Sequence, residues 1–204
     1  MPFITTPTID NFNRTNESPL NVATFGQQWS TKRIVDATST NLLKVVTNQC
    51  GGIGSSAQNQ QYVTGTIGPD CECYVTIPTL TAAGDQVALF ARIISPGTTN
   101  ASGYKVVVTA STSSWILARI DTAVNTTIAS ASQAFSAGDA FGISCIGSTI
   151  TGYYKAAAGL WKSILSATDT TYGAKGVIGM QIDKTTARAD TFGGGERNSF
   201  FIMM

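Results

Sequence analysis

Few side chains in this sequence have the chemistry of a catalyst. The chain contains no histidine, so it lacks the usual general base and the commonest protein metal ligand. Hydrolysis of a glycosidic bond needs two carboxyl groups that flank the bond. The nearest approach to such a pair is Asp70 and Glu72, which stand in a Gly-Pro turn beside two cysteines. A serine or cysteine nucleophile would also lack a base. The sequence therefore predicts a protein that is not an enzyme.

The four cysteines are Cys50, Cys71, Cys73 and Cys145. The single residue between Cys71 and Cys73 is too few for a zinc knuckle, although four thiolates could in principle bind a metal. On a strand, Cys71 and Cys73 share an apolar face with the hydrophobic residues that follow at the same spacing. We therefore expect buried thiols, with a disulfide between Cys50 and Cys71 or Cys73 as the alternative.

Aromatic side chains are the best candidates for binding a ligand. Sugars are bound by an aromatic platform with amide and carboxylate groups that read the hydroxyls. The residues available for such a platform are Trp115, Tyr153, Tyr154 and Trp161. Tyr153 and Tyr154 point to opposite sides of an expected strand, so one of them should be exposed. The alternative interpretation is that all four pack in the core or at its rim.

Period-two alternation of apolar residues runs through the chain, as in Val87, Leu89 and Ala91, and predicts many short strands. Expected strands include 29–35 and 185–192, and Ile146–Thr149 has the pattern of a tight hairpin turn. Helical patterns are confined to 156–163 and 166–172. Short strands separated by turn signals indicate a sandwich or barrel. We find no linker, so residues 1–204 are predicted to be one all-β domain.

Composition excludes several kinds of partner. Charged residues make up 12% of the chain and the net charge is +1, with basic residues scattered rather than clustered. This distribution argues against nucleic acid, whose phosphates require grouped Lys and Arg. No apolar run is long enough to insert into a membrane. The N-terminus lacks the features of a signal peptide, so we expect a chain made and used without conventional secretion.

Several motifs occur together in a recognisable order. The segment 10–20 is followed by Gly26 and Trp29; later come 137–139, Trp161, 168–169, 176–179 and 187–195. Over about residues 9–195 this order resembles the concanavalin A-like and laminin G-like jelly rolls of tailed-bacteriophage structural proteins and of bacterial surface proteins. The resemblance implies a two-sheet antiparallel β-sandwich in which the first and last strands lie side by side.

The resemblance also implies a structural calcium ion where the terminal strands meet. Its carboxylate ligands would be Asp10 and Asp190, with Asn11 or Asp169 as further ligands. The alternative is that these aspartates cap loops and pair with neighbouring arginines. No other cofactor is expected.

The segment 196–204 forms an apolar C-terminal tail. Its five last residues are Phe200, Phe201, Ile202, Met203 and Met204. Exposing them to water is costly, so the tail is predicted to dock onto a neighbouring chain. The alternative is an ordinary last strand within the domain's own sheet.

These observations predict a non-enzymatic structural protein on the surface of a tailed-phage virion, as capsid decoration or as part of a tail or fibre. It would be made in the host cytoplasm, and its partners would be other virion proteins or copies of itself in a homo-oligomer. Binding to host-surface glycans could accompany this role. The alternative is a lectin-like adhesion module of a bacterial surface, followed by a glycoside hydrolase with displaced carboxylates.

Overall fold

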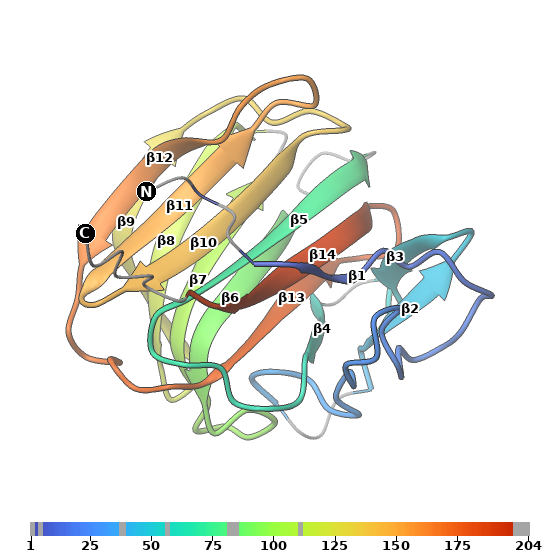
Figure 1. Cartoon of the computed structure of the whole chain (residues 1–204), viewed down its shortest axis with the longest axis horizontal. Coiled ribbons are helices and arrows are strands. Elements are labelled where there is room, and N and C mark those ends of the chain that lie inside the picture. Colours follow the sequence, from blue (N-terminus) through green and yellow to red (C-terminus); the bar gives the residue numbers. More distant parts are fainter. Residues whose placement is uncertain are drawn as a thin grey trace, which may run out of the picture.

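A computed structural model describes residues 3, 6–36, 40–55, 58–80, 86–109 and 112–197. They form two antiparallel sheets stacked face to face (Figure 1). In order of pairing, the eight-stranded sheet contains β12 (Lys162–Thr168), β11 (Thr149–Lys155), β10 (Ala140–Ile146), β5 (Cys71–Thr79), β14 (Arg188–Glu196), β3 (Gln49–Gly52) and β2 (Leu43–Val46), while β1 (Thr8–Asp10) also pairs with β14. The six-stranded sheet contains β4 (Gln58–Tyr62), β13 (Val177–Asp183), β6 (Gln86–Ile94), β7 (Ser102–Thr109), β8 (Ser114–Asp121) and β9 (Val124–Ser132). The expected all-β sandwich is confirmed.

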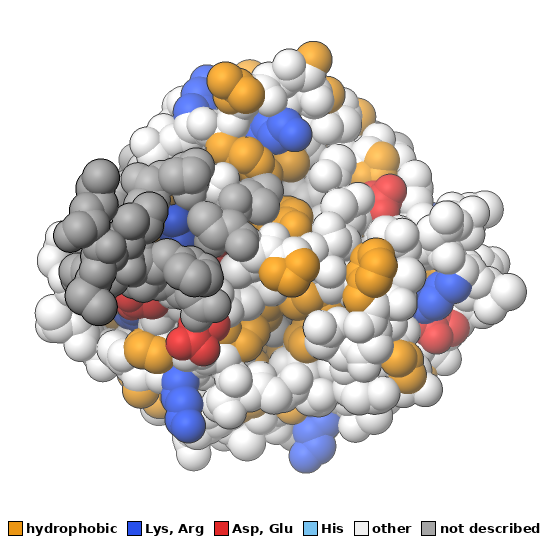
Figure 2. All heavy atoms as spheres, in the orientation of Figure 1, with side chains coloured by type: hydrophobic (Ala, Val, Ile, Leu, Met, Phe, Trp, Pro, Cys, Tyr) orange, Lys and Arg blue, Asp and Glu red, His pale blue; other side chains and the backbone are white. Residues whose placement is uncertain are grey.

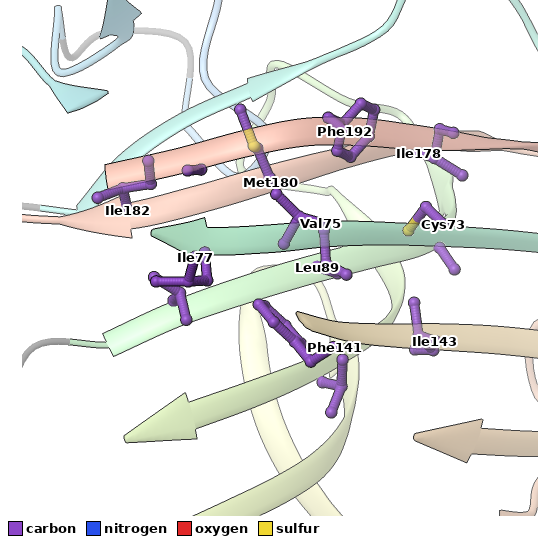
Figure 3. Close-up of a cluster of buried hydrophobic side chains, with 14 of the residues drawn as sticks. Cys73, Val75, Ile77, Leu89, Phe141, Ile143, Ile178, Met180, Ile182 and Phe192 are labelled. Carbon is purple, nitrogen blue, oxygen red and sulfur yellow. The ribbon is translucent and has the colours of Figure 1, made fainter. Parts of the chain in front are cut away.

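The main core lies between the two sheets and follows from the alternation of side chains along each strand. In β5, Cys73, Val75 and Ile77 point inward and meet Leu89 of β6 and Phe141 of β10 (Figure 3). Strands β13 and β14 contribute further buried side chains to the same layer. Burial of this layer supplies the main driving force for stacking the sheets.

A second, smaller hydrophobic cluster covers part of the outer face of the six-stranded sheet. Ala88 and Phe90 belong to it, whereas their neighbours Val87 and Leu89 belong to the main core. Ile34, from the segment before β2, is fully buried against this outer cluster. The second cluster therefore explains why β6 is hydrophobic on both faces.

The terminal strands pair as the resemblance implied. Thr8 lies opposite Gly193 and Asp10 lies opposite Phe192. Phe12 and Phe192 are both fully buried. The hairpin at 146–149 is also confirmed, because Ile146 pairs directly with Thr149 and Gly147 has a φ of 53°.

Three expectations about elements are wrong. Residues 162–168 form β12 along the edge of β11 rather than parts of two helices. The sheet edge offers this segment backbone partners, and Leu165 turns into the core. Segment 29–35 forms only an isolated bridge from Trp29 to Val63, and the last strand begins at Arg188 rather than at residue 185.

Among the described residues, no helix is long and apolar enough to span a membrane.

Candidate functional site

Two of the four aromatic residues expected to bind sugars are core residues. Trp115 is fully buried, and its indole packs edge to face against Phe135, Phe141 and Tyr154. Its Nε1 donates to the carbonyl oxygen of Gln133 at 2.9 Å. Tyr154 is buried beside it and donates its hydroxyl to Asp139. For these two residues the core alternative holds, and they offer no platform to a ligand.

Tyr153 and Trp161 instead come together on the outer face of the eight-stranded sheet. Both surround Phe3, which stacks on Tyr153 with ring centroids 3.9 Å apart and an interplanar angle of 8°. Trp161 meets Phe3 edge to face at 4.8 Å and Tyr74 at 6.4 Å. We call Phe3, Tyr74, Tyr153 and Trp161 the outer aromatic cluster.

Glycines in the sheet make room for this cluster. Gly193, Tyr74, Gly142 and Tyr153 lie opposite one another in a row that crosses four strands. A Cβ on Gly142 would lie 2.3 Å from Cζ of Phe3, and one on Gly193 would lie 2.2 Å from the Tyr74 ring. The absence of a side chain at Gly142 leaves room for Phe3, and its absence at Gly193 leaves room for the ring of Tyr74.

A hollow of about 340 Å³ adjoins the cluster. Its lining residues are Ser144, Ile146, Thr149, Thr151, Tyr153 and Arg197. Hydroxyls can both donate and accept hydrogen bonds, and a guanidinium donates several. On the part of the face in Figure 2 that is not grey, the charged side chains are scattered rather than clustered. The hollow is thus suited to a hydroxyl-rich ligand placed against an aromatic ring.

Arg197 and Glu72 fix one wall of this hollow. Glu72 is fully buried, and its Oε1 accepts hydrogen bonds from the backbone N–H and hydroxyl of Thr6 at 3.0 and 2.9 Å. Nε of Arg197 lies 3.3 Å from Oε2 of Glu72. The carboxylate therefore holds both the N-terminal segment and the arginine in place, and it neutralises the arginine's charge.

The two acids considered for hydrolysis do not face each other across a cleft. Glu72 lies on β5 and not in the turn, with its carboxylate engaged as described. Asp70 lies in the turn, where its Oδ1 accepts from Gly147 N at 2.8 Å and lies 3.5 Å from Nη2 of Arg92. Both carboxylates serve as anchors for neighbouring groups.

Asp10 does not fit the role of a calcium ligand. Its Oδ1 accepts from Phe12 N, from Arg14 Nη1 at 2.6 Å and from the Thr24 hydroxyl at 2.9 Å. Its Oδ2 accepts from Trp29 Nε1 at 2.8 Å. The carboxylate is fully buried, and the adjacent guanidinium already supplies its positive charge. Asp10 therefore caps a loop and pairs with Arg14, which was the alternative interpretation.

Asp190 lies near Asp10, but the two carboxylates accept their hydrogen bonds from different donors. Burial, followed by the nearby charge of Asp10, raises the pKa of Asp190. It lines a polar hollow of about 390 Å³, together with Asn11, Asn13, Thr47, Asn48, Gln49 and Thr191. Asp169 lies elsewhere, bound to Arg119. Across the described ranges, no three His, Cys, Asp or Glu residues are grouped so as to hold a metal ion. The residues present therefore do not fit the expected calcium site.

All four cysteines are buried and carry no disulfide bond in the structure. Cys73 donates to the Phe90 carbonyl oxygen at 3.4 Å, in keeping with a core thiol. Cys50 lies on β3, opposite Ala189, and β14 separates it from β5. The alternative of a disulfide from Cys50 to Cys71 or Cys73 is therefore wrong.

Sequence reasoning missed Phe3, Ser144, Thr151 and Arg197. Their contacts join segments far apart in the chain, so no local pattern pointed to them. The glycines at 142 and 193–195 were the available signal, because glycine in a strand marks a close approach of other groups. The predicted assembly residues Phe200, Phe201, Ile202, Met203 and Met204 lie outside the described residues.

No known sequence family matches the chain, and no curated protein matches it significantly. Solved structures of similar fold include the carbohydrate-binding module CBM66 from Bacillus subtilis, with 13% identity and a TM-score of 0.63 over 82% of this chain and 95% of that one. The Ca2+-bound exoplasmic/lumenal domain of VIP36 has 9% identity and a TM-score of 0.63 over 96% and 92% of the two chains.

A beta-glucanase from Bacillus licheniformis has 10% identity and a TM-score of 0.59 over 96% of this chain and all 100% of that one. Such low identities establish a shared fold and do not transfer an activity. The chain therefore has the concanavalin A-like and galectin-like jelly-roll fold, an architecture that lectins, carbohydrate-binding modules and glucanases have in common.

Proposed function

We propose that this protein binds glycans through the outer face of its eight-stranded sheet and does not hydrolyse them. The observation that carries the proposal is the hollow of Thr149, Thr151 and Arg197 beside the ring of Tyr153, which belongs to the outer aromatic cluster. A sugar ring combines an apolar face with a rim of hydroxyls. The aromatic rings match the first and the hydroxyl-lined hollow matches the second.

The electrostatics of the hollow favour a ligand without strong charge. Glu72 compensates the guanidinium of Arg197, so the wall presents donors with little net charge. Thr149, which is exposed at the start of β11, adds a neutral hydroxyl to the lining. The fold is compatible with this use, since the solved structures of similar fold include proteins named as a carbohydrate-binding module and a legume lectin-like domain.

A glycan array probed with the labelled protein tests the proposal. We expect binding to a restricted set of glycans, with Tyr153→Ala lowering affinity about tenfold because an aromatic contact of this kind contributes ~1.4 kcal/mol. Phe25→Ala is the matched control, since this aromatic side chain is 57% exposed and does not line the hollow. Absence of binding, or equal losses in the control, would contradict the proposal.

The non-enzymatic part has its own test. The wild-type protein should release no reducing sugar from a panel of β-glucans, and Asp70→Asn with Glu72→Gln should behave like the wild type. Hydrolysis by the wild type that disappears in this double variant would overturn the non-enzymatic assignment.

We also propose a place on a virion surface, as capsid decoration or tail component. This second role rests on the sequence resemblance alone. None of the solved structures named above is a virion protein. Detection of the protein in purified phage particles tests this role separately from glycan binding.

A further inference from the structure

Cys71 and Cys145 lie directly opposite each other on neighbouring strands. Cys71 begins β5, Cys145 stands near the end of β10, and the antiparallel register pairs them. Both side chains are buried in the main core, on the inner face of their sheet. The register therefore brings the two thiols to adjacent positions on paired strands.

The backbone at this position has the dimensions that a disulfide requires. Directly opposed residues of antiparallel strands have Cα atoms about 4.5 or 5.5 Å apart. Both values lie within the range of about 4.4–6.8 Å that disulfides span. The spacing of the paired strands is therefore compatible with a bond between these two residues.

The two thiols differ in the way that thiol–disulfide exchange requires. The hydrogen bond from Cys145, together with the guanidinium and backbone N–H of Arg92, lowers the pKa of Cys71 despite its burial. Burial, followed by the bond to Cys71, raises the pKa of Cys145 well above its ordinary value. Cys71 is thus the thiolate that attacks, and Cys145 is the thiol that resolves.

Neither of the other cysteines has such a partner. Cys73 lies opposite Ile143 on β10, two residues from the pair. Cys50 lies opposite Val45 and Ala189. The register therefore selects one cysteine pair from the four.

We propose that Cys71 and Cys145 form an intramolecular disulfide by exchange with a small-molecule disulfide such as oxidised glutathione. The Cys71 thiolate attacks one sulfur of glutathione disulfide and releases one glutathione thiolate. Cys145 then loses its proton and attacks the Cys71 sulfur of the mixed disulfide, which releases the second glutathione. The two cysteines are oxidised by two electrons, and one glutathione disulfide is reduced to two thiols.

Because both thiols are buried, exchange takes place during folding or local opening of the strand ends. The product ties β5 to β10 one position from Glu72 and Ser144, which lie opposite each other in the same register. It also joins residues far apart in sequence, so it restricts the unfolded chain strongly.

The test refolds the fully reduced full-length chain in a buffer of reduced and oxidised glutathione. Free thiols are then blocked with iodoacetamide under denaturing conditions, and the peptides are mapped by mass spectrometry. We expect a Cys71–Cys145 link as the dominant disulfide, with Cys50 and Cys73 alkylated. The linked protein should melt about 5–10 °C above the reduced protein, and dithiothreitol should remove the difference.

Two variants sharpen the result. Cys145→Ala should abolish both the linked peptide and the melting shift, whereas Cys50→Ala, at an equally buried cysteine, should retain both. Four alkylated cysteines in the refolded wild type, or a dominant link through Cys50 or Cys73, would overturn the proposal. The map of the wild type decides the question even if a variant fails to fold.

Discussion

Asp169 binds three groups at one end of the sandwich. Its Oδ1 accepts hydrogen bonds from the Tyr104 hydroxyl and from Thr171 N, both at 2.8 Å. Its Oδ2 accepts from Nη1 of Arg119 at 2.9 Å. Burial alone would raise the pKa of Asp169, but these hydrogen bonds outweigh it and lower the pKa to about 2. The residue therefore acts as a structural acceptor and not as a proton donor.

This lowered pKa makes part of the stability depend on pH. A folded-state pKa of about 2 lies below the ordinary value of about 3.9, so the stabilisation is complete above pH ~4 and is lost as pH falls towards 2. We expect Asp169→Asn to lower the urea midpoint at pH 6, and the gap from the wild type to narrow between pH 4 and pH 2. A gap that stays constant over this range would contradict the assignment.

Asp10 allows a test of metal removal. Replacing it with Asn should destabilise the protein by about 3 kcal/mol, because Arg14 loses a buried partner. The melting temperature of the wild type should be the same in EDTA and in millimolar CaCl2, since Asp10 has no role in binding the ion. A calcium-dependent rise in the wild type that vanishes in Asp10→Asn would establish the calcium site after all.

At the scale of elements, the N-terminal segment and the eight-stranded sheet depend on each other. Phe3 is 8% exposed and covers Gly142, while Thr6 is held by Glu72. Gly194 N also donates to the Pro7 carbonyl oxygen at 3.2 Å. Phe3 thus belongs to the outer aromatic cluster, and Thr6 and Pro7 are bound to the same sheet.

A double-mutant cycle measures this dependence. Gly142→Ala should cost about 1–3 kcal/mol because the new Cβ clashes with Phe3. Phe3→Ala removes the clashing ring, so the double variant should lose less stability than the sum of the single variants. Gly173→Ala, with no atom within 4 Å of its new Cβ, is the control. Strict additivity, measured by urea unfolding, would show that Phe3 and Gly142 do not interact.

At the scale of the whole molecule, a backbone hydrogen bond and an ion pair hold the described chain in place as far as residue 197. Arg197 N donates to the Asp70 carbonyl oxygen at 2.8 Å, and its side chain pairs with Glu72. The strand that precedes it, β14, has neighbours on both of its edges. These contacts hold the end of β14 and Arg197 in place within the described part of the chain.

Truncation after Asn198 tests the prediction that the tail serves assembly. The shortened protein should remain folded, with little change in melting temperature, because the contacts of Arg197 remain. It should lose oligomerisation in light scattering, since the apolar docking residues are gone. Unfolding of the truncated protein would instead mean that the tail is an internal strand.

The sequence by itself determined the fold class, because side-chain alternation along a strand is a local property that burial converts into a sheet face. It placed Val75 and Ile77 in the core and put Tyr153 and Tyr154 on opposite faces. It did not identify 162–168 as a strand, because the backbone partners of β12 are on β11 and no local propensity reports them.

Only the tertiary structure decided the candidate site and the roles of its acids. The stacking of Phe3 on Tyr153, and the pairing of Glu72 with Arg197, join residues separated by most of the chain. Asp10 had the right residue type and position for calcium, yet a surrounding set of hydrogen-bond donors occupies its oxygens. Residue types therefore limited the possible chemistry, and long-range packing determined which groups were left free to perform it.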